Sequence, residues 1–156
     1  MKMFTLRLKP KTVFGLIMIL TGAVVIAITF FSNHVESSKQ ASSAVMIETN
    51  EKREEYLKSL GWEFKTEFEE KSVNIPQEFN DTYTKYNELQ KKQGFSLDDY
   101  KGKSITVYTY QITNYPGYEN RDCVFANLLV CDGMLIGGDI CSTSLSDGFM
   151  QGLEKQ

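Results

Sequence analysis

An uncharged stretch near the N-terminus constrains this 156-residue chain more than any other feature. It begins at Val13 and ends at Phe31. As a helix it would extend about 28 Å, close to the ~30 Å of bilayer hydrocarbon. We therefore expect residues 13–31 to form a single transmembrane helix in contact with membrane lipid, preceded by a cytoplasmic tail of residues 1–12.

The distribution of basic residues predicts the orientation of this helix. Lys2, Arg7, Lys9 and Lys11 precede the apolar stretch, whereas few charges follow it directly. Because Lys and Arg are retained on the cytoplasmic side, the N-terminus should be cytoplasmic and the rest of the chain extracytoplasmic. A cleaved signal peptide is an alternative, but it needs a shorter apolar region and a nearby small-residue cleavage site, which the sequence lacks before residues 42–44. A buried helix of a soluble protein is a weaker alternative.

The remaining residues suit a stalk and one compact domain. Residues 32–49 are small and polar, as in flexible linkers, and residues 50–153 are enough for a single hydrophobic core. The formal net charge is −3, and both signs are mixed along the chain. This charge pattern argues against nucleic acid as a partner. We expect a single-pass protein of the cell membrane with an external domain.

The periodicity of apolar residues predicts an α+β fold for that domain. We expect one main helix, over residues 77–93, packed on an antiparallel sheet of four or five strands, with a shorter helix over residues 50–60. Strands are predicted over residues 62–68, 73–75, 104–113, 122–131 and 134–141. A charged turn should separate the first two strands, and the tail after residue 141 should cover a sheet face as a loop or short helix.

The last two strands are predicted to form a hairpin in the middle of the sheet. Asp132-Gly133 is typical of a two-residue type I′ turn. The turn places apolar side chains on both faces of the strand pair, as expected for central strands. The expected opposite pairs are Val130 with Leu135, Leu129 with Ile136, and Phe125 with Ile140. We expect the first helix and the tail, or a binding partner, to cover Phe125, Leu129, Ile136 and Ile140.

The cysteines Cys123, Cys131 and Cys141 lie on this hairpin. In ideal pairing no two of them are close enough for a disulfide. A bulge at Gly137-Gly138 would bring Cys123 and Cys141 to one face as diagonal neighbours, near the limit for bridging. The pattern favours three buried thiols, with the Cys123–Cys141 disulfide as the alternative.

Several segments, taken in order, resemble a domain-of-unknown-function family. The family comprises small single-pass membrane-anchored extracytoplasmic proteins of spore-forming Gram-positive bacteria. The resemblance implies an envelope domain in such a bacterium, and it supplies no activity, substrate or catalytic residue. The segments are GWE (61–63), IPQEF (75–79), YNELQKKQGF (86–95), YKGK (100–103), YTYQITNYP (108–116), ANLLVCDGMLIGGDICS (126–142) and DGFMQGL (147–153).

Few residues suggest chemistry. The single histidine, His34, lies in the predicted stalk, so the domain lacks the base that Ser-His or Cys-His catalysis requires. The cysteine spacing does not favour zinc, and we expect no cofactor and no catalytic residue. Asn127 and Asp139 interrupt apolar strands and are candidate binding residues. Tyr115 and Tyr118 lie on a predicted polar loop, where they either form a contact site or fold back on the rim of the sheet.

These features favour a noncatalytic protein-interaction module of the cell envelope, which binds another envelope protein or a second copy of itself. One alternative is an envelope hydrolase that uses Asp139, Asp132 or Glu119, which requires two of these carboxylates to converge in a cleft. The other is a module that binds glycan or peptide through the loop carrying Tyr115 and Tyr118.

Overall fold

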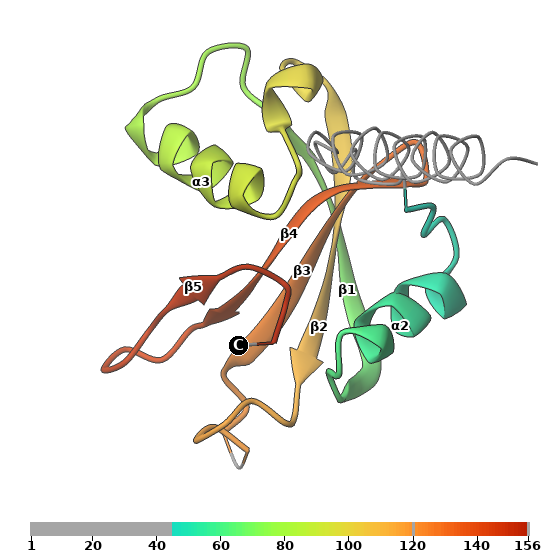
Figure 1. Cartoon of the computed structure of the whole chain (residues 1–156), viewed down its shortest axis with the longest axis vertical. Coiled ribbons are helices and arrows are strands. Elements are labelled where there is room, and N and C mark those ends of the chain that lie inside the picture. Colours follow the sequence, from blue (N-terminus) through green and yellow to red (C-terminus); the bar gives the residue numbers. More distant parts are fainter. Residues whose placement is uncertain (1–44, 120, 156) are drawn as a thin grey trace, which may run out of the picture. The chain divides into compact units, whose positions relative to one another are not determined.

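The computed structural model describes residues 45–119 and 121–155, which include a five-stranded antiparallel sheet. The strands follow one another in space in the order β1-β2-β3-β4-β5 (Figure 1). The predicted α+β class is confirmed, with two α-helices on the sheet. The elements are α2 (Asn50–Ser59), β1 (Phe64–Asn74), α3 (Asp81–Lys92), the 3-10 helix η1 (Leu97–Tyr100), β2 (Ser104–Ile112), β3 (Val124–Cys131), β4 (Met134–Ser142) and β5 (Met150–Gln151).

The predicted transmembrane helix, the cytoplasmic tail and most of the predicted stalk lie outside the described residues. Within the part of the chain that is described, none of the helices has the length and apolar character needed to cross a bilayer. Residues 45–47, at the end of the predicted stalk, pair with the start of β4. Ile47 donates its N–H to the Gly133 carbonyl and is only 1% exposed. The folded domain therefore includes these residues as well as those after Asn50.

The two helices lie on opposite sides of the sheet (Figure 1). The α2 side holds the larger core, which includes Leu57, Trp62, Tyr110, Leu128, Ile140 and Leu153. The α3 side holds a smaller core of Ile75, Leu97, Ile105, Leu129, Cys131 and Ile136. The prediction that the first helix and the tail cover Leu129 and Ile136 is wrong, because α3 and η1 lie over them. Ile140 belongs to the other face.

Strand β1 is continuous, so the predicted turn at residues 69–72 is wrong. Glu69, Glu70, Lys71 and Ser72 all pair with residues of β2. Charged residues are tolerated in this strand because β1 is at the edge of the sheet and is mostly exposed. Charges on an edge strand also disfavour pairing with other chains.

Helix α3 begins at Asp81, four residues later than predicted. The Asn80 side chain caps it, with Oδ1 accepting the Tyr83 N–H at 2.9 Å. An asparagine cap satisfies one of the free N–H groups of a first turn, so it competes successfully with Pro76 as a helix start.

The β3–β4 hairpin has the predicted turn but a shifted register. Asp132 and Gly133 have φ values of 50° and 77°, as a type I′ turn requires. Val130 pairs with Leu135 as predicted, but Ile136 is an extra residue in β4. Beyond this bulge Leu129 pairs with Gly137 and Phe125 with Cys141, so the predicted pairs Leu129–Ile136 and Phe125–Ile140 are wrong by one residue. Cys123, Cys131 and Cys141 are free thiols in this structure. Cys131 is buried, but Cys123 and Cys141 are partly exposed, so the prediction of three buried thiols is wrong for these two.

The tail contributes a strand instead of a loop or helix. Met150 and Gln151 form β5, which pairs with Cys141 and Ile140 of β4. Leu153 follows and is 1% exposed. Its carbonyl accepts the indole N–H of Trp62 at 2.6 Å, so the C-terminal segment completes the core on the α2 side.

Candidate functional site

A row of polar side chains crosses the α3 side of the sheet. Thr109 of β2 pairs with Asn127 of β3, which in turn pairs with Asp139 of β4. The Thr109 hydroxyl donates to Asn127 Oδ1 at 2.8 Å, and Asn127 Nδ2 donates to Asp139 Oδ1 at 3.0 Å. Tyr86 of α3 donates its hydroxyl to Asp139 Oδ2 at 2.7 Å. The structure thus brings the predicted binding residues Asn127 and Asp139 into one hydrogen-bonded network.

The carboxyl group of Asp139 is the most buried charge of this network. Asp139 is 2% exposed, and its burial raises the pKa of the carboxyl above its ordinary value of 3.8, although the hydrogen bonds from Tyr86 and Asn127 act in the opposite direction. Burial, with the nearby Asp139 carboxyl, also raises the pKa of Cys141 to about 11. The pKa of Tyr86 is raised for the same two reasons. Cys141 and Tyr86 are therefore neutral hydrogen-bonding groups at physiological pH.

An open cleft lies above this row, between α3 and the sheet. It encloses about 520 Å³, within the range of ligand pockets. Thr109, Asn127 and Asp139 line it together with Glu69, Glu70 and Lys71 of β1. The other lining residues are Val73, Ile75, Tyr83, Tyr86, Leu97, Ile105, Val107, Leu129 and Met150. The cleft therefore combines apolar walls with a few polar groups.

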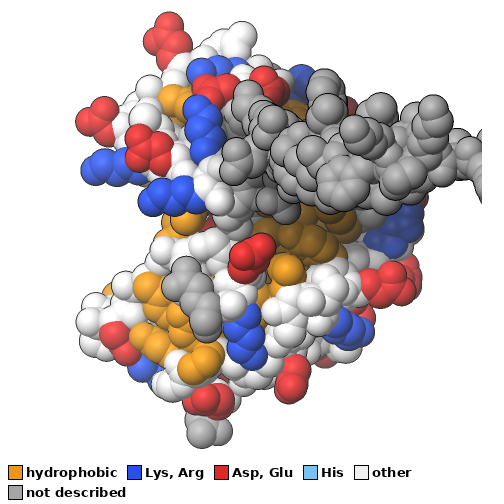
Figure 2. Space-filling model, viewed as in Figure 1, with side chains coloured by type: hydrophobic (Ala, Val, Ile, Leu, Met, Phe, Trp, Pro, Cys, Tyr) orange, Lys and Arg blue, Asp and Glu red, His pale blue; other side chains and the backbone are white. Residues whose placement is uncertain are grey.

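A second hollow adjoins the first along α3. It has a volume of about 530 Å³ and is lined by Thr82, Tyr83, Lys85, Tyr86, Leu89 and Met150. Tyr83, Tyr86 and Met150 line both hollows. The space-filling view shows the surface indented beside α3, with apolar side chains exposed at the indentation (Figure 2). Because the two hollows share these lining residues, we treat them as one groove, which we call the α3 groove.

Two glutamines hold α3 against β4 and so fix the width of the α3 groove. Gln90 Oε1 accepts the Gly138 N–H at 2.8 Å, and Gln93 Nε2 donates to the Gly138 carbonyl at 2.9 Å. Gln93 Oε1 also accepts the Leu153 N–H at 2.6 Å. Because Tyr86 and Gln90 are four residues apart on α3, they share one helix face. The contact of Gln90 with β4 therefore positions the Tyr86 hydroxyl above Asp139.

The predicted contact residues Tyr115 and Tyr118 lie elsewhere, in an aromatic cluster on the rim of the sheet. The Tyr115 ring stacks on Phe149, with centroids 4.6 Å apart, and on Trp62 at 5.8 Å. Its hydroxyl donates to Gln151 Oε1 at 2.8 Å. Tyr118 packs edge-on against Tyr115 and Phe149. Both rings fold back on the domain, and neither lines the α3 groove.

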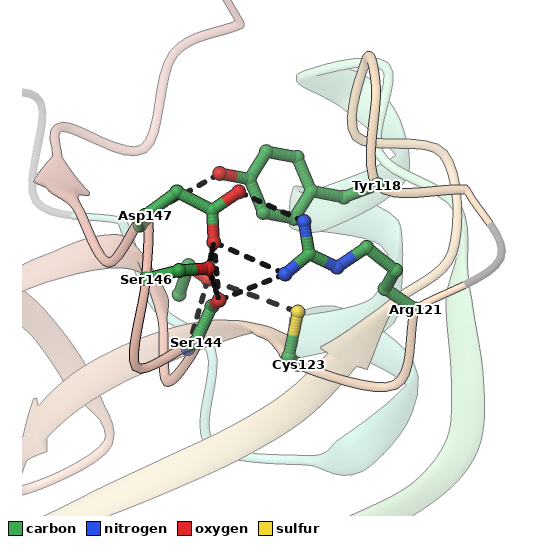
Figure 3. Close-up of polar contacts among 7 residues, drawn as sticks. Tyr118, Arg121, Cys123, Ser144, Ser146 and Asp147 are labelled. Carbon is green, nitrogen blue, oxygen red and sulfur yellow. Dashed lines mark hydrogen bonds and ion pairs between the residues drawn. The ribbon is translucent and has the colours of Figure 1, made fainter.

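A second polar cluster joins the β2–β3 connection to the β4–β5 connection (Figure 3). Arg121 forms a bidentate ion pair with Asp147, with N–O distances of 2.8 and 3.0 Å. Ser144 and Ser146 donate to the same carboxylate, and the Tyr118 hydroxyl donates to the Asp147 carbonyl. These contacts hold the pKa of Asp147 well below its usual range. The cluster is exposed, and the carboxylate beside its serines is ion-paired with Arg121 and is a weak base because its pKa is lowered, so we interpret the cluster as a clamp between two loops.

The carboxylates considered for hydrolysis do not converge. Asp139 lies within β4, whereas Asp132 is in the β3–β4 turn and Glu119 in the connection before β3. Glu119 instead accepts the Gly117 N–H at 3.1 Å. Within residues 45–119 and 121–155, no group of three His, Cys, Asp or Glu side chains is arranged to hold a metal ion.

A known protein family matches the part of the chain that contains most of the α3 groove. The model of the family "Domain of unknown function (DUF4830)" matches residues 56–140, which is more than half of the chain. The chain belongs to the DUF4830 family. The DUF4830 match runs from α2 to β4 and includes Tyr86, Thr109, Asn127 and Asp139, whereas Met150 lies beyond it. No curated protein and no solved structure matches the chain.

Membership of DUF4830 confirms the domain-of-unknown-function part of the resemblance. The membrane anchor and the spore-forming Gram-positive source stay predictions. Two residues of the site, Tyr86 and Thr109, were not predicted from the sequence. The available signal was the interruption of two apolar strands by Asn127 and Asp139, since buried polar side chains require hydrogen-bond partners.

Proposed function

We propose that this DUF4830 domain is a noncatalytic binding module of the cell envelope. Residues 13–31 anchor it as a single transmembrane helix, and the domain faces the outside. It binds a segment of another envelope protein, or of a second copy, in the α3 groove. The proposal rests mainly on the α3 groove, which is open and largely apolar, with hydrogen-bonding groups gathered at one place on its floor.

The residues that line the α3 groove are of the kinds found in ligand-binding sites. Binding sites in proteins are mostly apolar and contain a few polar groups that fix the orientation of the ligand. Here Val107 and Leu129 provide apolar floor beside Asn127 and Asp139. Met150, 55% exposed, extends the apolar surface along the second hollow. An extended segment would bury these side chains along the groove.

The arrangement of ionisable groups favours binding over hydrolysis. General acid–base hydrolysis by carboxylates needs two of them on either side of the reacting bond, and nucleophilic catalysis needs a base beside the nucleophile. Asp139 is surrounded by Tyr86, Asn127 and Cys141, none of which is an acid or base near neutral pH. We therefore propose a structural role for Asp139 in ligand recognition.

Photocrosslinking from adjacent residues of β1 tests the proposal. Lys71 lines the α3 groove, whereas the next side chain, Ser72, points to the other face of the sheet. There the Ser72 hydroxyl oxygen lies 3.1 Å from the Ser104 hydroxyl oxygen. A benzophenone amino acid placed at position 71 of the full-length chain, in its own cells, should yield one discrete protein adduct. The same residue at position 72 should not yield that adduct, and protease added to intact cells should remove it.

The mass of the adduct distinguishes the alternatives. A protein-sized increase supports a protein partner or a second copy, whereas an increase below about 1 kDa would indicate a small ligand or glycan fragment and contradict the protein partner. Equal labelling from positions 71 and 72, or no adduct at position 71, would refute binding in the α3 groove. Full protection of the domain from external protease would refute its display outside the cell.

A further inference from the structure

The side-chain hydrogen bonds on the floor of the α3 groove lead to the carboxyl group of Asp139, apart from one that Asn127 donates to Cys141. Thr109 donates its single hydroxyl hydrogen to Asn127, and Tyr86 donates its hydroxyl hydrogen to Asp139. Asn127 Nδ2 has two hydrogens, which it donates to Asp139 Oδ1 and to Cys141 Sγ at 3.5 Å. Every side-chain donor of Thr109, Asn127 and Tyr86 is thus used within the row.

The side-chain atoms of this row that stay free to bind a ligand are therefore hydrogen-bond acceptors. An ionised carboxylate has about four acceptor positions. Each oxygen of Asp139 accepts from one donor of the row, and the Cys141 thiol also hydrogen-bonds this carboxylate, which leaves about one acceptor position free. The hydroxyl oxygens of Tyr86 and Thr109 also keep free lone pairs. A ligand that itself offers only acceptors, such as a carboxylate, would meet no donor at this place. A ligand that donates several hydrogen bonds would fit.

The charges around the row favour a cationic donor. Glu69 and Lys71 of β1 face the groove, and Lys85 lines its second hollow. Glu69 pairs with Thr109 at the end of the row, whereas Lys71 pairs with Val107, one step further along the strand face. Within the described residues, no lysine or arginine nitrogen lies within ion-pair distance of Asp139. A buried carboxyl group without a cationic partner is costly to ionise, so a ligand cation would gain more here than at the surface.

We propose that the α3 groove recognises a lysine side chain of the partner, with its ammonium group bound at Asp139. This inference rests on the proposed function and names the group that enters the groove. A lysine combines a four-carbon apolar stem with three donors at its tip. The stem would pack on Val107 and Leu129, and the ammonium would donate to Asp139 and to the free lone pair of Tyr86.

Butyl compounds with different head groups test this inference. Full-length protein in lipid nanodiscs, with methyl and side-chain amide groups labelled for NMR, is titrated with n-butylammonium, n-butanol and n-butyrate near pH 7. The Asn127 amide and the Val107 and Leu129 methyl signals should shift with n-butylammonium. The apparent affinity should be at least about ten-fold weaker for n-butanol, because hydrogen bonds to charged groups contribute ~1.5–3 kcal/mol. Butyrate should bind still more weakly.

Two carboxylate-to-amide variants assign the selectivity to one residue. Asp139→Asn should remove the preference for n-butylammonium, whereas Asp132→Asn, which changes the net charge equally in the β3–β4 turn, should keep it. Unshifted Leu57 signals verify that each variant is folded, since Leu57 is fully buried on the α2 side. Butanol or butyrate binding as tightly as butylammonium would overturn the inference, as would an unchanged preference in Asp139→Asn. The absence of any signal shift with butylammonium would also overturn the inference. The proposed function is tested separately, by the crosslinking from position 71.

Discussion

Replacing Trp62 by alanine should lower the free energy of unfolding by about 3–5 kcal/mol, the usual cost of truncating a buried tryptophan. Trp62 is 2% exposed and lies in the core on the α2 side. Its ring stacks on Tyr115, and its indole N–H donates to the Leu153 carbonyl. Alanine would leave a cavity and release the C-terminal segment. Urea unfolding of the full-length chain in mild detergent, followed by far-UV circular dichroism, measures the change.

Trp62→Phe is the matched variant for this prediction. It keeps an aromatic ring in the core and loses the hydrogen bond to Leu153. Its loss of stability should be clearly smaller than that of Trp62→Ala, since large-to-small changes add a cavity cost. Equal stability of Trp62→Ala and the unmodified protein would show that Trp62 is not part of the core.

Gly138→Ala should destabilise the domain by about 1–3 kcal/mol, the range for inserting atoms into a packed core. A Cβ at this position would lie 2.6 Å from both the Asn127 carbonyl oxygen and Leu153 Cδ1. The carbonyl oxygen belongs to the neighbouring strand, so it cannot move without distorting the β3–β4 pairing. The shift would also disturb the hydrogen bonds of Gln90 and Gln93 to Gly138. Urea unfolding measures the loss.

Gly137→Ala provides the comparison, because it adds the same methyl group on the other face. Its Cβ would lie 2.8 Å from Gln90 Oε1 and 3.5 Å from Leu97 Cδ2, both side-chain atoms. Side chains can adjust more easily than a paired backbone, so Gly137→Ala should cost less than Gly138→Ala. The reverse order would contradict the described packing of β4.

Patterns that depend on neighbouring residues predicted much of the fold. The helix at Asn50–Ser59 has a Thr49 cap, and the Asp132-Gly133 turn forms the hairpin at the predicted place. In both cases the signal is local, because caps and tight turns are specified by the residues that form them.

Features that depend on distant contacts could not be predicted. The charges of residues 69–72 suggest a turn, but pairing with β2 holds them in a strand. Apolar side chains on both faces of the hairpin require cover on both sides, yet they do not indicate which helix covers which face. The extra residue Ile136 shifts the register of β4 by one, and this shift decides which face Ile140 occupies.

The site was predictable only in part for the same reason. Asn127 and Asp139 are visible as polar residues within apolar strands. Tyr86 lies within the helix predicted over residues 77–93, but its contact with Asp139 spans 53 positions in the sequence and depends on where α3 crosses β4. Thr109 enters the row through the β2–β3 register, which no turn between those strands specifies.

Solvent paramagnetic relaxation tests most directly whether the α3 groove is open. A small neutral nitroxide is dissolved with methyl-labelled full-length protein in nanodiscs. We expect faster relaxation for the methyl groups of Val73 and Val107, which line the groove, than for those of Leu57 and Leu128, which are fully buried on the α2 side. Equal, slow relaxation of all four residues would show that α3 seals this face of the sheet and that the α3 groove is not open to a ligand.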